Sequence, residues 1–334
     1  MDFVTGGTGL LGSHLLLRLT EQNRRIRAIY RNPKKVDAVR YLFESIDPEN
    51  WEQRWNKIEW IEGDILDIQG LEQTLIGCTD IYHCAGLVSF DPRQFDRVMK
   101  INREGTANMV NCCLDLKVRK FCHVSSTAAI GGIPNTITNE ETQWKNTPEI
   151  SGYAHSKYAA EREVWRGIEE GLHAVIVNPS VLFGAGNWDD SSMTIFRTVD
   201  KGLPFYTSGQ NGFVDARDVA DIMVQLMESD IAHERFLCVG ENVPFQSILT
   251  KIAKRLQKKP PYLSTPRWLM GLAWRISWIV ARLRGHSPTV TKETTASAFK
   301  SMTYDTSKIQ NALGYTFRPI DETIDYAVCY RMYT

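Results

Sequence analysis

The stretch Thr5-Gly6-Gly7-Thr8-Gly9-Leu10-Leu11-Gly12 decides which fold we expect for this chain. It follows the apolar run 3–5 and precedes an amphipathic segment, 10–22. In such a strand–loop–helix unit, the first glycine permits a tight turn, the second lets a phosphate approach the backbone, and the third lets helix and strand pack closely. N–H groups at the start of the helix then bind the pyrophosphate of a dinucleotide. We therefore expect these residues to contact a dinucleotide cofactor: Gly6, Thr8, Gly9, Leu10, Leu11 and Gly12.

Short apolar runs alternate with helical patterns along the first half of the chain. This alternation is typical of βαβ units with a parallel sheet. Right-handed crossovers make such a sheet doubly wound, and its ligands bind beyond the carboxyl ends of the strands. We therefore predict an α/β fold in which residues 1–180 form a Rossmann-type doubly wound parallel sheet that binds NAD(P). The expected strands cover residues 3–5, 26–30, 58–61, 80–83, 120–124 and 174–178, with helices such as 10–22 and 101–116 between them.

Glycine and proline residues interrupt this pattern after Pro179. Helices are expected near residues 191–201 and 218–228. Residues 236–239 have the composition of one more strand, so we expect the chain to return to the sheet there. Residues 181–334 are then mostly a smaller substrate-binding or lid domain that is interleaved with the first.

Composition restricts the function classes further. The 334 residues include 39 basic and 39 acidic side chains and are 43% hydrophobic. These values indicate a folded globular protein and argue against general nucleic-acid binding. Seven cysteines without a CxxC spacing are typical of free thiols in a reducing compartment and argue against a metal site. Because no signal-peptide pattern is visible either, we expect a cytoplasmic protein that binds a small-molecule substrate and no metal.

The second expected strand bears on the choice of cofactor. It ends at Arg31, nineteen positions after Gly12, where an Asp or Glu would accept the ribose hydroxyls of NAD. Residues 18–40 contain eight basic and two acidic residues. Such a cluster pairs well with a 2′-phosphate. We therefore predict NADP rather than NAD, bound by Arg31 and Lys35, with a solvated basic face as the structural alternative.

Tyr153 and Lys157 lie at positions i and i+4 of an expected helix, so their side chains share one face. A phenol is a poor acid–base catalyst at neutral pH, but a neighbouring cation favours the phenolate and lowers the pKa. Ser126 follows the strand 120–124 at the ligand edge of the sheet, where its hydroxyl can stabilise an alkoxide. Each pattern alone also occurs in surface helices and strand-end turns. Their combination predicts proton transfer at a carbonyl or alcohol group that exchanges a hydride.

These motifs together resemble the extended short-chain dehydrogenase/reductase family, also called the NAD(P)-dependent epimerase/dehydratase group. The likeness covers residues 3 to about 326 and includes the stretches 212–220 and 304–315. It implies a catalytic triad of Ser126, Tyr153 and Lys157, with Asn102 as a residue that positions the helix. It also implies cofactor contacts at Tyr153, Lys157 and these strand-end residues: Asp64, Ile65, Ala85, Gly86 and Pro179.

Departures from the family pattern narrow the expected activity. Family dehydratases that act on nucleotide sugars carry Asp-Glu after the catalytic Ser or Thr, whereas Thr127 and Ala128 follow Ser126. The chain looks most similar to dihydroflavonol-reductase-like and 3β-hydroxysteroid-dehydrogenase-like members. We therefore expect an NADP-dependent oxidoreductase that reduces a ketone, or oxidises a secondary alcohol, on a bulky apolar substrate. The alternatives are a nucleotide-sugar epimerase with tightly bound NAD and a nucleotide-binding membrane-surface or sensor protein.

The segment 251–300 carries eleven basic residues and one acidic residue, Glu293. Within it, the Trp-rich run 268–283 is interrupted by Arg275 and is too short and too charged to span a bilayer. Three interpretations of residues 267–284 remain open. They form the wall of an apolar substrate pocket, an interfacial helix in peripheral contact with a membrane, or a core or homodimer helix.

Overall fold

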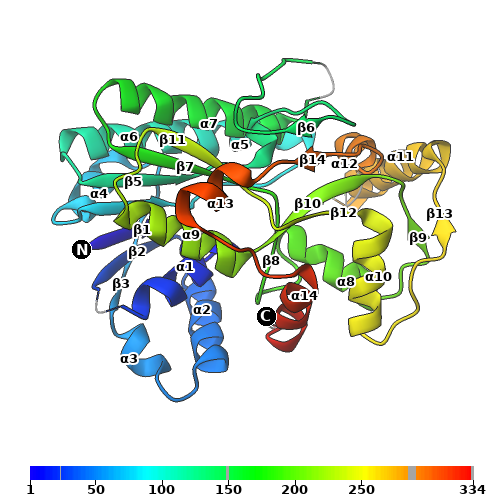
Figure 1. The fold of residues 1–334 in the computed structure, drawn as a ribbon, viewed down its shortest axis with the longest axis horizontal. Helices are drawn as coiled ribbons and strands as arrows, with labels where there is room; N and C mark the ends of the chain where they lie inside the picture. The colour runs from blue at the N-terminus through cyan, green and yellow to red at the C-terminus, as the bar shows by residue number, and fades with distance from the viewer. Residues whose placement is uncertain (23, 148–149, 285–290, 332–334) are drawn as a thin grey trace.

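The computed structural model describes residues 1–22, 24–147, 150–284 and 291–331 (Figure 1). Within these residues, a seven-stranded parallel sheet forms the centre, in the order β11-β7-β5-β4-β1-β2-β3. All six strands expected in the first half are confirmed, as is the return of the chain to the sheet. The strands are β1 (Asp2–Thr5), β2 (Ile26–Tyr30), β3 (Ile58–Glu62), β4 (Asp80–His83), β5 (Lys120–Val124), β7 (Ala174–Pro179) and β11 (Glu234–Cys238).

The strand order reverses between β1 and β4, which lie side by side although two other strands separate them in the sequence. Connections leave these two neighbours in opposite directions, so their carboxyl ends border a crevice. Strands β1, β4, β5 and β7 are fully or almost fully buried, because helices cover both faces of the sheet. The crevice at β1 and β4 is therefore where a doubly wound sheet binds its ligand.

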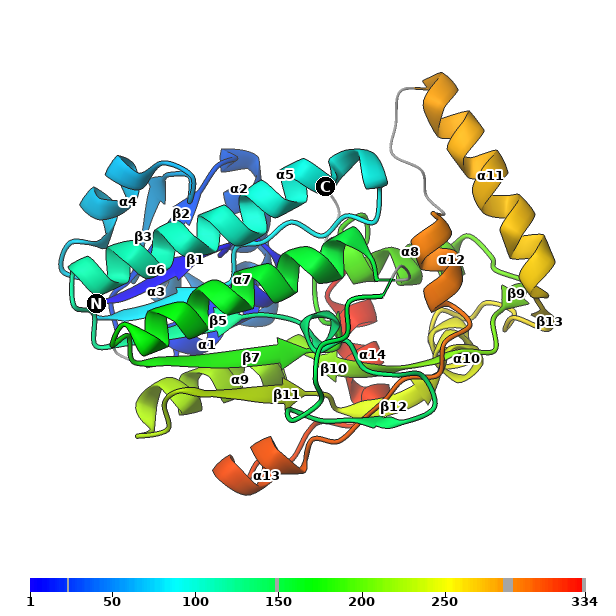
Figure 2. The ribbon, with the colours of Figure 1, turned by 90° about the horizontal axis from the view of Figure 1, so that it is seen from above.

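Helices cover the two faces of the sheet as separate layers (Figures 1 and 2). Leucines of the first helix and the apolar face of α9 fill one core, and residues of α4, α6 and α7 fill the other. The first layer contains α1 (Leu10–Thr20), α2 (Pro33–Ile46), α3 (Trp51–Trp55) and α9 (Ala216–Glu228). The second contains α4 (Ile68–Leu75), α5 (Phe95–Met99), α6 (Gly105–Asp115) and α7 (Gly152–Glu169).

A second group of elements lies beyond the carboxyl ends of the strands (Figure 1). Phe183, Phe196 and Phe213 lie at the centre of its own apolar core. A three-stranded sheet combines β8 (Val181–Phe183), β10 (Gln210–Asp215) and β12 (Glu241–Pro244), and the helices α8 (Thr194–Asp200), α10 (Phe245–Arg255) and α14 (Ile320–Cys329) pack around it.

The remaining elements are short or peripheral. Helix α11 borders α12 and runs along the outer end of the molecule (Figure 2). Within the described residues, no helix combines the length and the apolarity that crossing a bilayer requires. The elements are β6 (Ile137–Thr138), β9 (Phe205–Tyr206), β13 (Leu263–Ser264), β14 (Thr303–Tyr304), α11 (Arg267–Arg284), α12 (Lys292–Ser297) and α13 (Ser307–Leu313).

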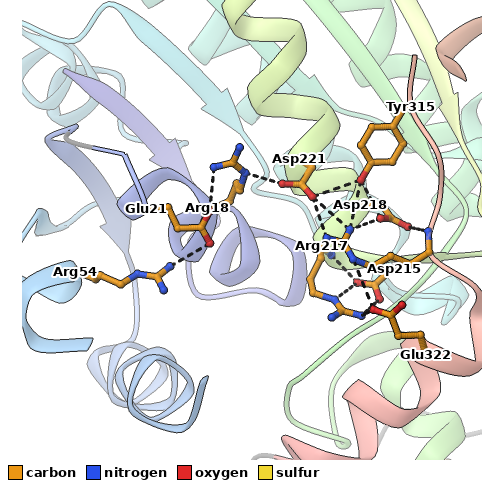
Figure 3. A network of polar contacts seen from close by, with 10 residues as sticks. Arg18, Glu21, Arg54, Asp215, Arg217, Asp218, Asp221, Tyr315 and Glu322 are labelled. Atoms are coloured by element: carbon orange, nitrogen blue, oxygen red, sulfur yellow. Dashed lines mark hydrogen bonds and ion pairs between the residues drawn. The ribbon is translucent and has the colours of Figure 1, made fainter. Parts of the chain in front are cut away.

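A buried ion-pair network holds the C-terminal segment against α9 and α1 (Figure 3). Asp218, whose side chain is fully buried, pairs with the guanidinium of Arg318 and accepts a hydrogen bond from the Tyr315 hydroxyl at 2.9 Å. Asp221, one turn later, accepts from Nε of Arg18 on α1 at 2.6 Å. The acidic residues of the 212–221 region therefore join three segments that are distant in the sequence.

Candidate active site

The glycine loop forms the turn between β1 and α1, and two of its glycines have no room for a side chain. Gly6 has a φ of +69°, and a Cβ there would lie 2.6 Å from the backbone nitrogen of Ala85 after β4. A Cβ on Gly12 would overlap the Gly6 carbonyl and lie 2.8 Å from Cα of Gly7. Around Gly9, by contrast, the closest atom is the Gly6 carbonyl oxygen at 3.3 Å. Gly6 and Gly12 therefore let the loop pack closely against its neighbours, while Gly9 leaves the start of α1 open to a phosphate.

The first turn of α1 suits an anion. Gly9 caps this helix without a side-chain hydrogen bond, and its first turn contains no acidic residue. The N–H groups at the start of a helix lack carbonyl partners within it and carry a partial positive charge. Thr8 and Leu10 are half-buried and Gly9 is exposed, whereas the side chain of Leu11 belongs to the core under the sheet. Any ligand contact of Leu11 would therefore be made by its backbone.

Asn102 and Gly86 come together at the carboxyl end of β4. The Asn102 amide donates to the Leu87 carbonyl at 3.0 Å and accepts from the Leu87 N–H at 2.7 Å, so it holds the chain that follows β4. The same amide donates to Oγ of Ser156 on α7 at 2.8 Å. Asn102 lies in a π-helical turn (Lys100–Glu104), where the sequence predicted a regular helix over 101–116. Such turns re-aim side chains and are frequent at functional sites.

Lys157 lies at the same edge of the sheet. Its ammonium group donates to the Val124 carbonyl at the end of β5 at 2.7 Å. A Cβ on Gly86 would lie 3.9 Å from this ammonium and 3.4 Å from Oδ1 of Asn102. Burial lowers the pKa of Lys157 to about 8, while the Glu161 carboxylate opposes the shift. The lysine is therefore a cation that can release its proton close to neutral pH.

The expected effect of Lys157 on Tyr153 is wrong in this structure. Burial raises the pKa of the Tyr153 phenol, and the opposing effect comes from a hydrogen bond with Ser126 rather than from the lysine. The physical reason is the direction of the Lys157 side chain, whose ammonium is held by the Val124 carbonyl. Ser126 itself caps the short turn Thr127–Ala129 through a hydrogen bond from the Ala128 N–H at 3.2 Å. In this structure Tyr153 is therefore in contact with Ser126, while Lys157 is held at the end of β5.

A buried carboxylate that the sequence interpretation missed, Glu161, supports these residues. It lies one turn after Lys157 on α7 and is 2% exposed. Its Oε2 atom accepts from Oγ of Ser125 at 2.7 Å and from Nδ2 of Asn178 at 2.8 Å, and the same Asn178 nitrogen donates to the Ser126 carbonyl at 3.0 Å. Glu161 thus holds the Ser125 side chain directly and the Ser126 carbonyl through Asn178. The feature of the sequence that could have indicated Glu161 is its position four residues after Lys157, on the same face of the helix.

The predicted cofactor residues on β2, β3 and β7 lie at the carboxyl edge as well. Arg31 is 57% exposed at its side chain and lies 3.8 Å from the carboxylate of Asp64, which follows β3. Lys35, in the first turn of α2, lies 3.4 Å from the carboxylate of Asp190. Ile65 packs its side chain against Gly105 in the core, and Pro179 is buried at the end of β7. Arg31 and Lys35 are therefore the accessible cations of this group.

Phe90 contacts Tyr153, and a second aromatic ring and a carboxylate contact the preceding residue, Gly152. The Phe90 ring meets the Tyr153 ring edge-on, with centroids 5.6 Å apart. Phe95 packs against Gly152, the preceding residue, where a Cβ would lie 2.8 Å from the Phe95 ring. From α12, Oε1 of Glu293 accepts from the Gly152 N–H at 3.4 Å, and burial raises the pKa of this carboxyl. The segment that follows β4 thus presents apolar side chains, Phe90 and Phe95, to Tyr153 and its neighbour Gly152.

The comparison with protein families agrees with this geometry. The model of the NAD dependent epimerase/dehydratase family matches residues 3–240. This range contains all the strands of the central sheet except Asp2, the first residue of β1. The chain belongs to this family. As a member it is an NAD(P)-dependent enzyme of the oxidoreductase and epimerase type, with a small-molecule substrate. The resemblance found in the motifs is therefore confirmed.

Relatives of known name include several reductases. The putative dihydroflavonol 4-reductase of Synechocystis sp. is 29% identical over 336 residues, which cover 98% of this chain and 93% of the relative. Sterol demethylase protein B of Methylococcus capsulatus is 28% identical over 277 residues, covering 81% and 79%. Cinnamoyl-CoA reductase 1 of Petunia hybrida is 28% identical over 277 residues, covering 77% and 78%.

Solved structures share the fold along nearly the whole chain. The crystal structure of gox2253 has a TM-score of 0.80 and 28% sequence identity, and the match covers 99% of this chain and 97% of the other. The Bordetella bronchiseptica enzyme WbmH in complex with NAD+ has a TM-score of 0.73 at 18% identity, covering 98% and 97%. At that identity, the second likeness supports the fold alone.

Proposed function

We propose that this family member is an NADP-dependent oxidoreductase that reduces a ketone, or oxidises the matching secondary alcohol, on a bulky apolar substrate. The observation that carries the proposal is the meeting of Tyr153 with Ser126, together with the Lys157 ammonium at the end of β5, the strand that Ser126 follows. The phenol of Tyr153, the hydroxyl of Ser126 and the ammonium of Lys157 together suit the transfer of a proton to an oxygen whose carbon receives a hydride.

The residues of the crevice fit a nicotinamide dinucleotide. The open position at Gly9, at the start of α1, suits a pyrophosphate, and Arg31 with Lys35 suits a 2′-phosphate. When bound, the cofactor supplies or accepts the hydride. The remaining proposed contacts lie along the strand ends: Thr8, Gly9, Leu10, Leu11, Asp64, Ile65, Ala85, Gly86, Tyr153, Lys157 and Pro179.

Within this proposal, each catalytic side chain has a distinct task. Tyr153 holds the proton that passes to the substrate oxygen, and Ser126 donates a hydrogen bond to that oxygen. Lys157 binds the cofactor ribose and returns a proton to the tyrosine, which its pKa of about 8 permits near neutral pH. Asn102 acts as a positioning residue, because its amide ties the chain after β4 to Ser156 on the catalytic helix.

Two observations favour a bulky apolar substrate. Phe90 and Phe95 lie beside Tyr153 and Gly152, where a ring-bearing substrate would pack. Three relatives are named for dihydroflavonol, cinnamoyl-CoA and sterol compounds, which all carry rings. In this proposal residues 1–180 with β11 bind the cofactor, and most of 181–334 forms the substrate-binding part.

A cofactor-coupled screen tests the proposal. Ketones, sterol-like alcohols and UDP-sugars are assayed with NADPH and NADH in parallel, and nucleotide released from the purified protein is identified. We expect turnover with NADPH, and Arg31→Ala should raise the KM for NADPH about tenfold, the loss of one charged hydrogen bond, with little effect on NADH. Tightly bound NAD and turnover of a UDP-sugar without net redox would instead establish an epimerase.

Replacing the phenol tests the assignment of Tyr153. Tyr153→Phe should lower kcat about 100-fold to 10,000-fold, the usual contribution of general acid–base catalysis, with cofactor affinity nearly unchanged. Tyr158→Phe is the matched control, because Tyr158 lies on the same helix and stacks on Trp144 with centroids 4.3 Å apart. A Tyr153→Phe variant that kept most of its kcat would exclude this mechanism.

A further inference from the structure

An exposed apolar row marks the described part of helix α11. Trp268, Leu272 and Ile276 are 71%, 49% and 52% exposed, and they follow one another at intervals of four residues. Residues at this spacing share one face of a helix. Tyr262 and Leu263, which precede the helix, are 69% and 42% exposed. We name Trp268, Leu272 and Ile276 the α11 row. Large apolar side chains that gather on a surface mark an interaction site.

Basic residues flank this row in the sequence, and acidic residues are missing from the segment. Between residues 257 and 292 the sequence has seven basic residues and no Asp or Glu. Arg275 is exposed and lies next to Ile276, seven positions after Trp268, so it borders the row. Arg267, at the start of the helix, is also exposed. The face therefore combines tryptophan and aliphatic side chains with guanidinium groups.

We propose that the α11 row docks on an anionic membrane surface, with the helix lying in the interface and not crossing it. Trp at the headgroup level, aliphatic side chains in the acyl boundary and Arg against lipid phosphates are the composition of an interfacial helix. Helix α11 lies at the outer end of the molecule (Figure 2), and the α11 row is exposed to solvent there. Because the whole chain has a formal net charge of zero, attraction to an anionic surface would be local to this segment.

A second copy of this chain fits the same face less well. Two α11 rows packed together would bring Arg267 and Arg275 of both copies into one interface. No carboxylate from 257–292 would be present to offset these charges, and like charges that face each other oppose association. Lipid phosphates, by contrast, pair with guanidinium groups and leave the aliphatic side chains in the hydrocarbon.

Sedimentation with vesicles tests the proposal on the full-length protein. We expect the protein to sediment with vesicles of equimolar phosphatidylcholine and phosphatidylglycerol, and much less with phosphatidylcholine alone. The triple variant Trp268→Ser, Leu272→Ser, Ile276→Ser should bind the anionic vesicles about 100-fold more weakly, because three half-exposed apolar side chains are lost. Arg275→Gln should weaken binding to anionic vesicles about fivefold and leave binding to neutral vesicles unchanged.

The matched control removes equally exposed apolar side chains elsewhere. Ile68 and Ile76 at the two ends of α4 are 50% and 64% exposed, so Ile68→Ser with Ile76→Ser should bind vesicles as the wild type does. Unchanged thermal unfolding of the triple variant would show that its fold is intact.

Three results would overturn the proposal. The wild type stays in the supernatant with both kinds of vesicle. The triple variant binds anionic vesicles as tightly as the wild type. The wild type ignores vesicles and is a dimer by light scattering, while the triple variant is a monomer, which would make the α11 row a self-association surface.

Discussion

Glu161→Gln tests whether the buried carboxylate under Ser126 organises the candidate site. The substitution keeps the size of the side chain, but four donors point at the carboxylate that it removes. They are Oγ of Ser125 at 2.7 Å, Nδ2 of Asn178 at 2.8 Å, Nη1 of Arg235 at 3.0 Å and Nε1 of Trp165 at 3.3 Å. A glutamine brings N–H donors of its own, so at least one contact becomes donor against donor.

The expected loss of stability follows from the burial of the ion pair between Glu161 and Arg235. The side chain of Glu161 is 3% exposed and that of Arg235 is 21% exposed. Removing one partner of a buried pair costs about 3–5 kcal/mol. We expect the lower value, about 3 kcal/mol, because Arg235 is partly hydrated and still donates to the Glu140 carbonyl. At about 2 °C per kcal/mol for a chain of this size, the unfolding midpoint should fall by about 6 °C.

The pH dependence of turnover separates an electrostatic role from a structural one. Burial lowers the pKa of Lys157 to about 8, and Glu161 acts in the opposite direction. Without this carboxylate, the pKa of Lys157 falls further and the lysine loses its proton at lower pH. If the protonated lysine is the active form, the alkaline limb of kcat lies near pH 8 in the wild type and moves to lower pH in Glu161→Gln.

The assay is kcat from about pH 6 to about pH 10 together with a thermal unfolding scan. Glu163→Gln is the matched control, because Glu163 lies on the same helix and pairs with Arg103 and Arg166 near the surface. That control should lose at most about 1 kcal/mol and keep its pH profile. A Glu161→Gln variant whose alkaline limb stays in place would refute the electrostatic role, and an unchanged unfolding midpoint would refute the structural one.

Two further substitutions test the frame around the site. Gly12→Ala should cost about 1–3 kcal/mol and weaken cofactor binding, because the new Cβ overlaps the Gly6 carbonyl. Gly271→Ala is the control, because only a flexible arginine end lies 3.5 Å from its Cβ position, and it should lower neither the unfolding temperature nor the cofactor affinity. Arg318→Ala should lower the free energy of unfolding in urea by about 3 kcal/mol, because Asp218 would stay buried without its cation. Arg40→Ala is the control, because the acidic partners of Arg40 are exposed, and it should cost less than about 1 kcal/mol. Burial already raises the pKa of Asp218, against the effect of Arg318. The stability loss of Arg318→Ala should therefore shrink as the pH falls, because Asp218 holds a proton in the folded variant that it releases in the unfolded chain. A stability loss that grew on acidification would contradict this assignment.

Local sequence patterns predicted the frame of the molecule with little error. The run Ile26–Tyr30 is a strand with the predicted limits, because its apolar residues are buried on both sides of the sheet. The helix predicted over 101–116 is correct in place but begins with a π-helical turn, which no local periodicity indicates. The turn is associated with the contacts of Asn102 to Leu87 and Ser156, residues that the sequence separates by 15 and 54 positions.

The sequence by itself determined the glycine loop, the strands of the central sheet and the residue types at the strand ends. These features depend on neighbours within a few residues, such as the spacing of glycines or the i, i+4 pair Tyr153 and Lys157. Only the tertiary structure decided where each charge points. It directs Lys157 at the Val124 carbonyl, places Glu161 under Ser126 and exposes the α11 row. Hydrogen bonds and burial depend on atoms from distant segments, and no local pattern specifies which of them meet.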